Sequence, residues 1–160
     1  MSTTIVTEQE GDGFYIAQFK TASLAIFSYY VESKNSAYLI DPTIDTKPYD
    51  DLLTKRGAKL EAVFLSHYHA DFLSGHTQYK VPIIMGEKAH RDSNTFKITE
   101  MKDGDQFNLG VTTTTVIHTP GHTLECSCFL LQDAEKNSIA LFSGDTLFIG
   151  DVGRPDLAAG

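Results

Sequence analysis

The segment SHYHADFLSGH, residues 66–76, places three metal-capable side chains within five residues. It directly follows the apolar run Ala62–Leu65, which predicts a short buried strand. His67, His69 and Asp71 stand at alternate positions after that strand, and imidazole and carboxylate are ligands that zinc, iron and manganese accept. Because ionisable groups are rarely buried without a partner, this spacing predicts a metal site.

A second motif, HTPGHT at residues 118–123, points to the same site. Pro120 and Gly121 predict a tight turn after a strand, and that turn can direct His122 back toward the first cluster. His118 lies on the strand side of the turn, so we expect it to have a structural role.

A third motif, SGDT at residues 143–146, again follows an apolar strand. Gly144 permits a sharp bend, which makes Asp145 an anionic ligand candidate at a strand end. Three strand ends therefore deliver candidate ligands to one rim. We expect the side chains of His67, His69, His122 and Asp145 to converge there.

The remaining pattern predicts many strands and few helices, which is typical of sheets flanked by helices. A short helix opens at Pro48, buries Leu52 and Leu53, and stops at Gly57. Glu87–Asp92 is expected to form a helical turn or two. Strands are expected, besides Ala62–Leu65, at Phe14–Phe19, Leu24–Val31, Ala37–Ile40, Val81–Met85, Thr112–Ile117, Cys126–Leu131 and Ile139–Phe142.

The charge balance argues against nucleic acid as a partner. With 13 basic and 21 acidic residues the formal net charge is −8, and such a surface repels phosphate backbones. No apolar run approaches the roughly 20 residues of a membrane helix, so no membrane association is expected. The N-terminus, MSTTIVTEQEGDG, matches neither a secretory signal nor a transit peptide. We expect a cytoplasmic protein, with the mitochondrial matrix as the alternative compartment.

The two cysteines, Cys126 and Cys128, are too close in sequence for a normal disulfide. We expect two reduced thiols on one face of a strand, in a reducing compartment.

The order of these motifs resembles the metallo-β-lactamase superfamily, and most closely its persulfide dioxygenase branch, including the forms linked to rhodanese domains. The resemblance covers nearly the whole chain, and it is most specific in its last part. It rests on SHYHADFLSGH (66–76), HTPGHTLECSCFLL (118–131) and FSGDTLFIGDVGRPDL (142–157). It implies an α/β fold of the αββα sandwich type. We expect residues 1–160 to be the N-terminal part of that domain, without a rhodanese domain.

The resemblance also implies a site. His67, His122 and Asp145 match the iron ligands, a two-histidine, one-carboxylate set that leaves open positions for oxygen and substrate. We expect one Fe(II) per subunit, with zinc as the alternative metal. His69 and Asp71 match positions close to the metal that orient ligands or bound water.

Two further positions match residues near the thiol substrate of the family, Thr123 and Arg154. The Arg154 guanidinium suits a glutathione carboxylate, although a loop salt bridge is the simpler interpretation. His76 follows the SGH pattern of the same branch, without an assignable role. Phe72 stands where the dinuclear zinc hydrolases have a histidine, so the sequence predicts one metal and not two.

The resemblance implies that the protein oxidises a persulfide, such as glutathione persulfide, with molecular oxygen to sulfite. One alternative is a thioester hydrolase similar to glyoxalase II, which Phe72 disfavours. Another is a non-catalytic metal-binding remnant. Apolar strands such as Ile139–Phe142 need cover on both faces. We therefore expect an exposed apolar patch, or its cover by a second copy or by the remaining C-terminal part of the fold.

Overall fold

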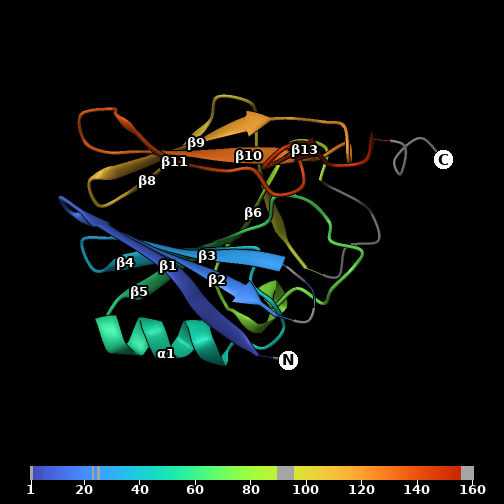
Figure 1. Cartoon of the computed structure of the whole chain (residues 1–160). Coiled ribbons are helices and arrows are strands. Elements are labelled where there is room, and N and C mark those ends of the chain that lie inside the picture. The colour runs from blue at the N-terminus through green and yellow to red at the C-terminus, as the bar shows by residue number, and fades with distance from the viewer. Residues whose placement is uncertain (1, 23, 25, 90–95, 156–160) are drawn as a thin grey trace. The chain divides into compact units, whose positions relative to one another are not determined.

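The structure is a computed structural model that describes residues 2–22, 24, 26–89 and 96–155. The chain divides into two compact units, which are considered separately below (Figure 1). Unit 1 comprises Met1–Phe64, His69–Ile83 and Leu109–Val111. Unit 2 comprises Leu65–Tyr68, Ile84–Asn108 and Thr112–Gly160.

Unit 1 is a sheet whose strands pair in chain order. The first four strands are antiparallel, and the fifth runs parallel to the fourth after a helix (Figure 1). The elements are β1 (Thr3–Gly11), β2 (Phe14–Thr21), β3 (Ile26–Ser33), β4 (Ser36–Ile40), α1 (Lys47–Arg56) and β5 (Lys59–Phe64), followed by the short 3₁₀ helix η1 (His76–Gln78).

Helix α1 confirms the helix expected from the sequence. Pro48 lies in its first turn, and Gly57 ends it in the left-handed conformation at φ 66°. Leu52 is buried, whereas Leu53 is only half-buried. The sequence did not identify Tyr49, which is fully buried and whose hydroxyl lies 2.7 Å from Ser28 Oγ on β3. The helix is therefore fastened to the sheet by a polar contact as well as by apolar packing.

Strand β5 carries the buried run that leads to the first motif. Ala62, Val63 and Phe64 have no exposed surface, and Leu65 is 1% exposed. Within unit 1 the Val63 N–H donates a hydrogen bond to Pro82 O, and within unit 2 the Leu65 N–H donates one to Ile84 O. The prediction of a buried strand is confirmed. The first motif therefore begins directly after a fully buried run of the chain.

Unit 2 contains an antiparallel sheet of four strands in the order β11-β10-β9-β8 and a small hairpin of β12 with β13 (Figure 1). Its sheet core contains Val116, Phe129, Leu131 and Phe142, all at most 3% exposed. The strands of this unit are β6 (Ile83–Gly86), β7 (Ile98–Met101), β8 (Gln106–Leu109), β9 (Thr112–His118), β10 (Ser127–Gln132), β11 (Ser138–Phe142), β12 (Leu147–Phe148) and β13 (Asp151–Val152). Two of their end residues, Ile83 of β6 and Leu109 of β8, are counted in unit 1.

The sequence interpretation was wrong or incomplete at several places. It missed β1, which pairs with β2 along its length although all its residues except Thr3 are exposed. It also missed the short strands β7, β8, β12 and β13. Glu87–Lys88 form a turn, and the rest of the helical turn expected over Glu87–Asp92 lies mostly outside the described residues. Among the described residues, no helix has the length and apolarity needed to cross a membrane.

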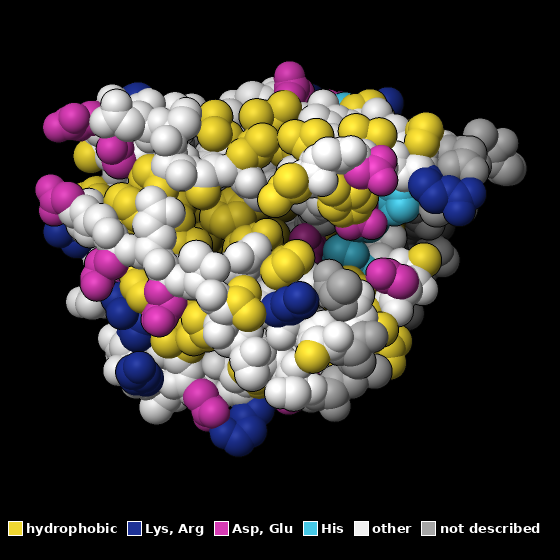
Figure 2. Space-filling view, viewed as in Figure 1, with side chains coloured by type: hydrophobic (Ala, Val, Ile, Leu, Met, Phe, Trp, Pro, Cys, Tyr) yellow, Lys and Arg dark blue, Asp and Glu magenta, His cyan; other side chains and the backbone are white. Residues whose placement is uncertain are grey.

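Apolar side chains are exposed at the edge of unit 2. Strand β11 ends the four-stranded sheet, and Leu141 on it is 48% exposed. Figure 2 shows hydrophobic side chains gathered over β10, β11 and the β12–β13 hairpin. The other members of this apolar edge are Leu147, Phe148, Ile149 and Val152, at 45–107% exposure. Leu141 on strand β11 is thus open to solvent, whereas Phe142 beside it is buried.

We expect the chain to bind a hydrophobic fluorescent dye through this apolar edge, because clustered exposed apolar groups offer such dyes a surface. Changing Leu141 and Phe148 together to lysine should lower the dye fluorescence at least about two-fold. A matched control makes the same change to lysine at Ile5 and Ile44 of unit 1, whose side chains are exposed to a similar extent. A dye-silent wild-type chain would contradict the prediction.

Candidate metal centre

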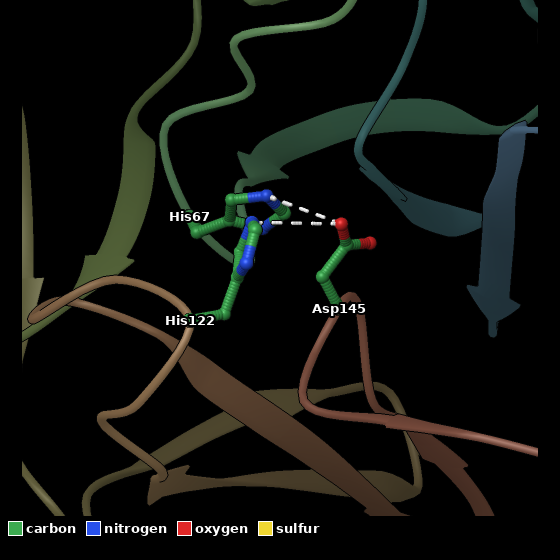
Figure 3. Close-up of side chains that lie close together, drawn as sticks. All are labelled: His67, His122 and Asp145. Atoms are coloured by element: carbon green, nitrogen blue, oxygen red, sulfur yellow. Dashed lines mark ion pairs between the residues drawn. The ribbon is translucent and has the colours of Figure 1, made fainter. Parts of the chain in front are cut away.

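The three motifs bring three side chains of unit 2 together. His67 lies in the segment after β5, His122 in the turn after β9, and Asp145 in the turn after β11. Asp145 Oδ2 lies 3.6 Å from His122 Nε2 and 3.9 Å from His67 Nε2 (Figure 3). One ligand atom from each residue lies within 4.8 Å of the other two, the one such group among the described residues.

This donor set fits a single metal ion. Ligand atoms that each lie about 2.0–2.2 Å from one ion can be at most about 4.4 Å apart. Both distances from Asp145 Oδ2 to the histidine Nε2 atoms are shorter than that, and all three ligand atoms lie within 4.8 Å of one another. Two imidazoles and a carboxylate are the set found in mononuclear iron sites and also in zinc sites with an open position. His67 is 2% exposed, whereas the side chain of Asp145 is 41% exposed, so the centre opens on the aspartate side.

Neighbouring groups orient both imidazoles. Ser66 Oγ lies 3.0 Å from His67 Nδ1, and the carbonyl oxygen of Arg154 lies 3.2 Å from His122 Nδ1. When each Nδ1 carries the proton and donates to these oxygens, each Nε2 is left unprotonated toward Asp145. The two rings stand nearly perpendicular, at 84°, with centroids 5.0 Å apart.

Gly144 is required for the close approach of the Asp145 turn. Its φ is +49°, and a Cβ there would lie 2.4 Å from Ser66 Oγ and 2.6 Å from Ser66 Cβ. The sharp bend expected from the sequence is confirmed. The same Ser66 that contacts His67 thus packs directly against the backbone that carries Asp145.

His69 and Asp71 belong to unit 1. His69 Nε2 lies 2.9 Å from Asp41 Oδ1, and both side chains are at most 7% exposed. The His69 ring also packs against Phe72, with centroids 4.3 Å apart. Asp71 is exposed. Their expected convergence with His67 stays a prediction, and Asp41 is a partner that the sequence interpretation did not name.

A cavity of about 430 Å³ in unit 1 lies beside this part of the first motif. His69, Asp71 and Phe72 line it together with apolar side chains and three threonines. His76 lies nearby in the sequence, with its Nδ1 2.9 Å from Ser74 Oγ. Burial lowers the pKa of His76, and the neighbouring His69 lowers it further.

Unit 2 also contains three further residues that the sequence analysis singled out, Thr123, Arg154 and His118. Thr123 Oγ1 lies 3.2 Å from Cys126 Sγ, while Arg154 is exposed and contributes its carbonyl to His122. Their roles toward a substrate stay predictions. His118 ends β9, where its N–H donates to Asp103 Oδ1.

Both cysteines are free thiols at most 4% exposed, as expected for a reduced pair, although Cys126 precedes β10. Burial raises the pKa of the Cys126 thiol, and the hydrogen bond with Thr123 partly opposes that rise. Buried thiols of this kind are poor nucleophiles.

Residues 23–160 match the family model described as the metallo-beta-lactamase superfamily. Curated relatives include hydroxyacylglutathione hydrolases of Francisella tularensis subsp. novicida, 34% identical over 138 residues, and of Francisella philomiragia, 34% identical over 140. Each alignment covers 84% of this chain and 52% of the relative. The chain thus spans about half the length of these relatives.

Solved structures agree on the fold. A metallo-beta-lactamase from Staphylococcus aureus superposes with a TM-score of 0.83 at 30% identity, covering 91% of this chain and 47% of that one. ETHE1 from Myxococcus xanthus superposes at 0.75 and 22% identity, covering 91% and 63%; at that identity it is evidence of the fold alone. The expected fold class, an α/β fold of the metallo-β-lactamase type that is here represented in part, is confirmed.

Proposed function

Given that the chain belongs to the metallo-beta-lactamase superfamily, we propose that it carries the single metal centre of an enzyme that acts on a group bonded to the sulfur atom of glutathione. The observation that carries this proposal is the grouping of His67, His122 and Asp145 within 4.8 Å. The names of the curated relatives supply the glutathione-linked substrate class.

Two reactions fit such a centre, each with one observation in its favour. Hydrolysis of a hydroxyacylglutathione thioester is supported by the names of relatives 34% identical to this chain, and the comparisons favour it. Oxidation of glutathione persulfide is supported by Phe72, which replaces a histidine of the two-zinc hydrolases and leaves a mononuclear set. In that oxidation the S–S bond breaks and the thiol leaves. Molecular oxygen and one water supply the three oxygens of sulfite, and oxygen accepts the electrons.

The residues of the chain have the same tasks in either reaction. Asp145 contributes the negative charge of the centre and stands on its open side. Ser66 and the Arg154 carbonyl hold the two imidazoles so that their Nε2 atoms face Asp145. A bound divalent ion would supply Lewis acidity, and Fe(II) would also supply electrons for oxygen. We propose that Thr123 and the Arg154 guanidinium contact the glutathione part of the substrate.

One preparation tests the proposal. The protein is purified without added metal, its iron and zinc are measured, and the sample is given each substrate separately. We expect about one metal per chain. Oxygen uptake with glutathione persulfide supports oxidation, and thiol release from the hydroxyacylglutathione supports hydrolysis. Metal binding without either activity would leave the third alternative, a non-catalytic metal-binding protein, and would refute the proposed reactions for this chain.

A further inference from the structure

Four consecutive residues of unit 2, Glu125-Cys126-Ser127-Cys128, contact each of the three segments that carry the candidate ligands. We call them the anchor segment. They are at most 4% exposed, and Glu125, at 1%, is a carboxylate removed from solvent. Burying such a group costs free energy unless hydrogen bonds compensate for it. A buried glutamate beside a candidate metal centre therefore indicates a definite role.

The anchor segment is bonded to the backbone on both sides of His67. Glu125 Oε1 accepts a hydrogen bond from the Tyr68 N–H at 3.2 Å. The Ser127 N–H donates to Ser66 O at 3.0 Å. Because the residues before and after His67 are both bonded, the direction of its side chain is constrained by the backbone as well as by Ser66 Oγ.

The same four residues also contact the turn that carries His122. The Thr119 N–H donates to Cys126 O at 2.8 Å, and Cys126 Sγ lies 3.2 Å from Thr123 Oγ1. Thr119 lies before His122 and Thr123 directly after it. The turn is thereby bonded at both of its ends to one residue of the anchor segment.

The turn that carries Asp145 is reached through Cys128. Its thiol donates to Ser143 O at 3.7 Å and lies 3.6 Å from Thr119 Oγ1. Thr119 Oγ1 in turn lies 2.9 Å from Thr146 Oγ1, which joins the His122 turn to the Asp145 turn. All three ligand-bearing segments are thus bonded to one another through the anchor segment.

We propose that the anchor segment is the positioning element of the metal centre, and that Glu125 is its positioning residue for His67. The proposal rests on the proposed metal centre. Glu125 acts through the Tyr68 backbone and need not touch the ion. Outer contacts of this kind set the geometry of ligands, and their loss typically weakens metal binding by about 10- to 100-fold. The simpler alternative is that these contacts only stabilise the start of β10.

The test is titration of the metal-free protein with Co²⁺, followed by the visible absorption bands of the bound ion. Glu125→Ala should weaken Co²⁺ binding by about 10- to 100-fold and shift the bands. Glu125→Gln keeps an acceptor oxygen of the same reach, so it should bind within about 3-fold of wild type with unshifted bands. The control Phe129→Leu, a fully buried site on the same unit's sheet, should lower thermal stability and leave the bands unchanged.

A second pair of variants keeps the test independent of whether Glu125→Ala folds. Thr119→Val is nearly isosteric and removes the hydroxyl that joins the two turns, so it should weaken Co²⁺ binding by about 2- to 10-fold. Thr119→Ser keeps the hydroxyl and should restore binding.

The outcomes separate this proposal from the proposed function. The wild-type chain first has to bind Co²⁺ with a distinct spectrum. If Glu125→Ala and Thr119→Val then show the same Co²⁺ affinity and the same absorption bands as the wild type, the positioning role is refuted while the metal centre stands. Equal losses in Glu125→Gln and Glu125→Ala would also refute it, because the acceptor oxygen would then not matter. A wild-type chain that binds no Co²⁺ would refute the metal centre itself.

Discussion

Changing Asp145 to alanine is expected to lower the affinity of the centre for Fe(II) by more than about 100-fold, beyond the loss that removal of an outer contact causes. Asp145 is the one anionic member of the group, and its Oδ2 faces both histidine Nε2 atoms. Two neutral imidazoles alone hold Fe(II) weakly. Metal content after dialysis, measured beside the far-ultraviolet circular dichroism spectrum, checks this, because the fold should largely remain.

The matched control for Asp145→Ala is Asp151→Ala. Asp151 is an exposed aspartate of β13 in the same unit, and its Oδ1 accepts a hydrogen bond from the backbone N–H of the neighbouring Val152. Asp151→Ala therefore removes one carboxylate charge, as Asp145→Ala does, from a position close to Asp145 in the sequence. If Asp145→Ala retains full iron content, Asp145 is not a ligand and the proposed centre is wrong.

Changing Phe72 to histidine is expected to raise bound zinc from about one toward two ions per chain. Phe72 stands where the two-zinc hydrolases have a ligand, and its ring already packs against His69 at 4.3 Å. A histidine there would place a third metal-capable side chain beside His69 and Asp71. The measurement is zinc per chain by elemental analysis after equilibration with excess zinc and gel filtration.

Phe72→Leu serves as the control, because it also removes the phenylalanine ring that packs against His69 but adds no metal ligand. It should keep about one zinc per chain. Two ions at full occupancy in the unmodified protein would show that Phe72 does not limit the metal number. That result would remove the observation that favours persulfide oxidation over hydrolysis.

The candidate ligands could be identified from the sequence because each lies in a short motif that closely follows a strand. His67, His122 and Asp145 each lie three or four residues after the end of a strand. The groups that orient them could not be identified in the same way. Ser66 is adjacent to His67 in sequence, but the Arg154 carbonyl is 32 residues from His122. No local pattern marks a carbonyl as a hydrogen-bond acceptor for a distant imidazole.

The strands and the helix of the fold could likewise be predicted from the sequence only in part. Strands β2, β4 and β9 and helix α1 were predicted because burial imposes a pattern on their sequences. Strand β1 was missed because eight of its nine residues are exposed, so no burial pattern is imposed. It is held by main-chain pairing with β2 and by the Thr3–Thr21 hydroxyl contact at 2.8 Å. Such pairing depends on the neighbour and not on the strand's own side chains.

Which residue types are available to a metal, and that they follow buried strands, can be read from the sequence, because both are properties of short segments. That the Glu125–Cys128 segment contacts all three ligand segments became visible in the folded chain alone. Its hydrogen bonds join Glu125 to Tyr68 and Cys128 to Ser143, residues separated by 57 and 15 positions. Contacts at such separations form when the chain folds and the sheet register is set, and no spacing within a motif encodes them.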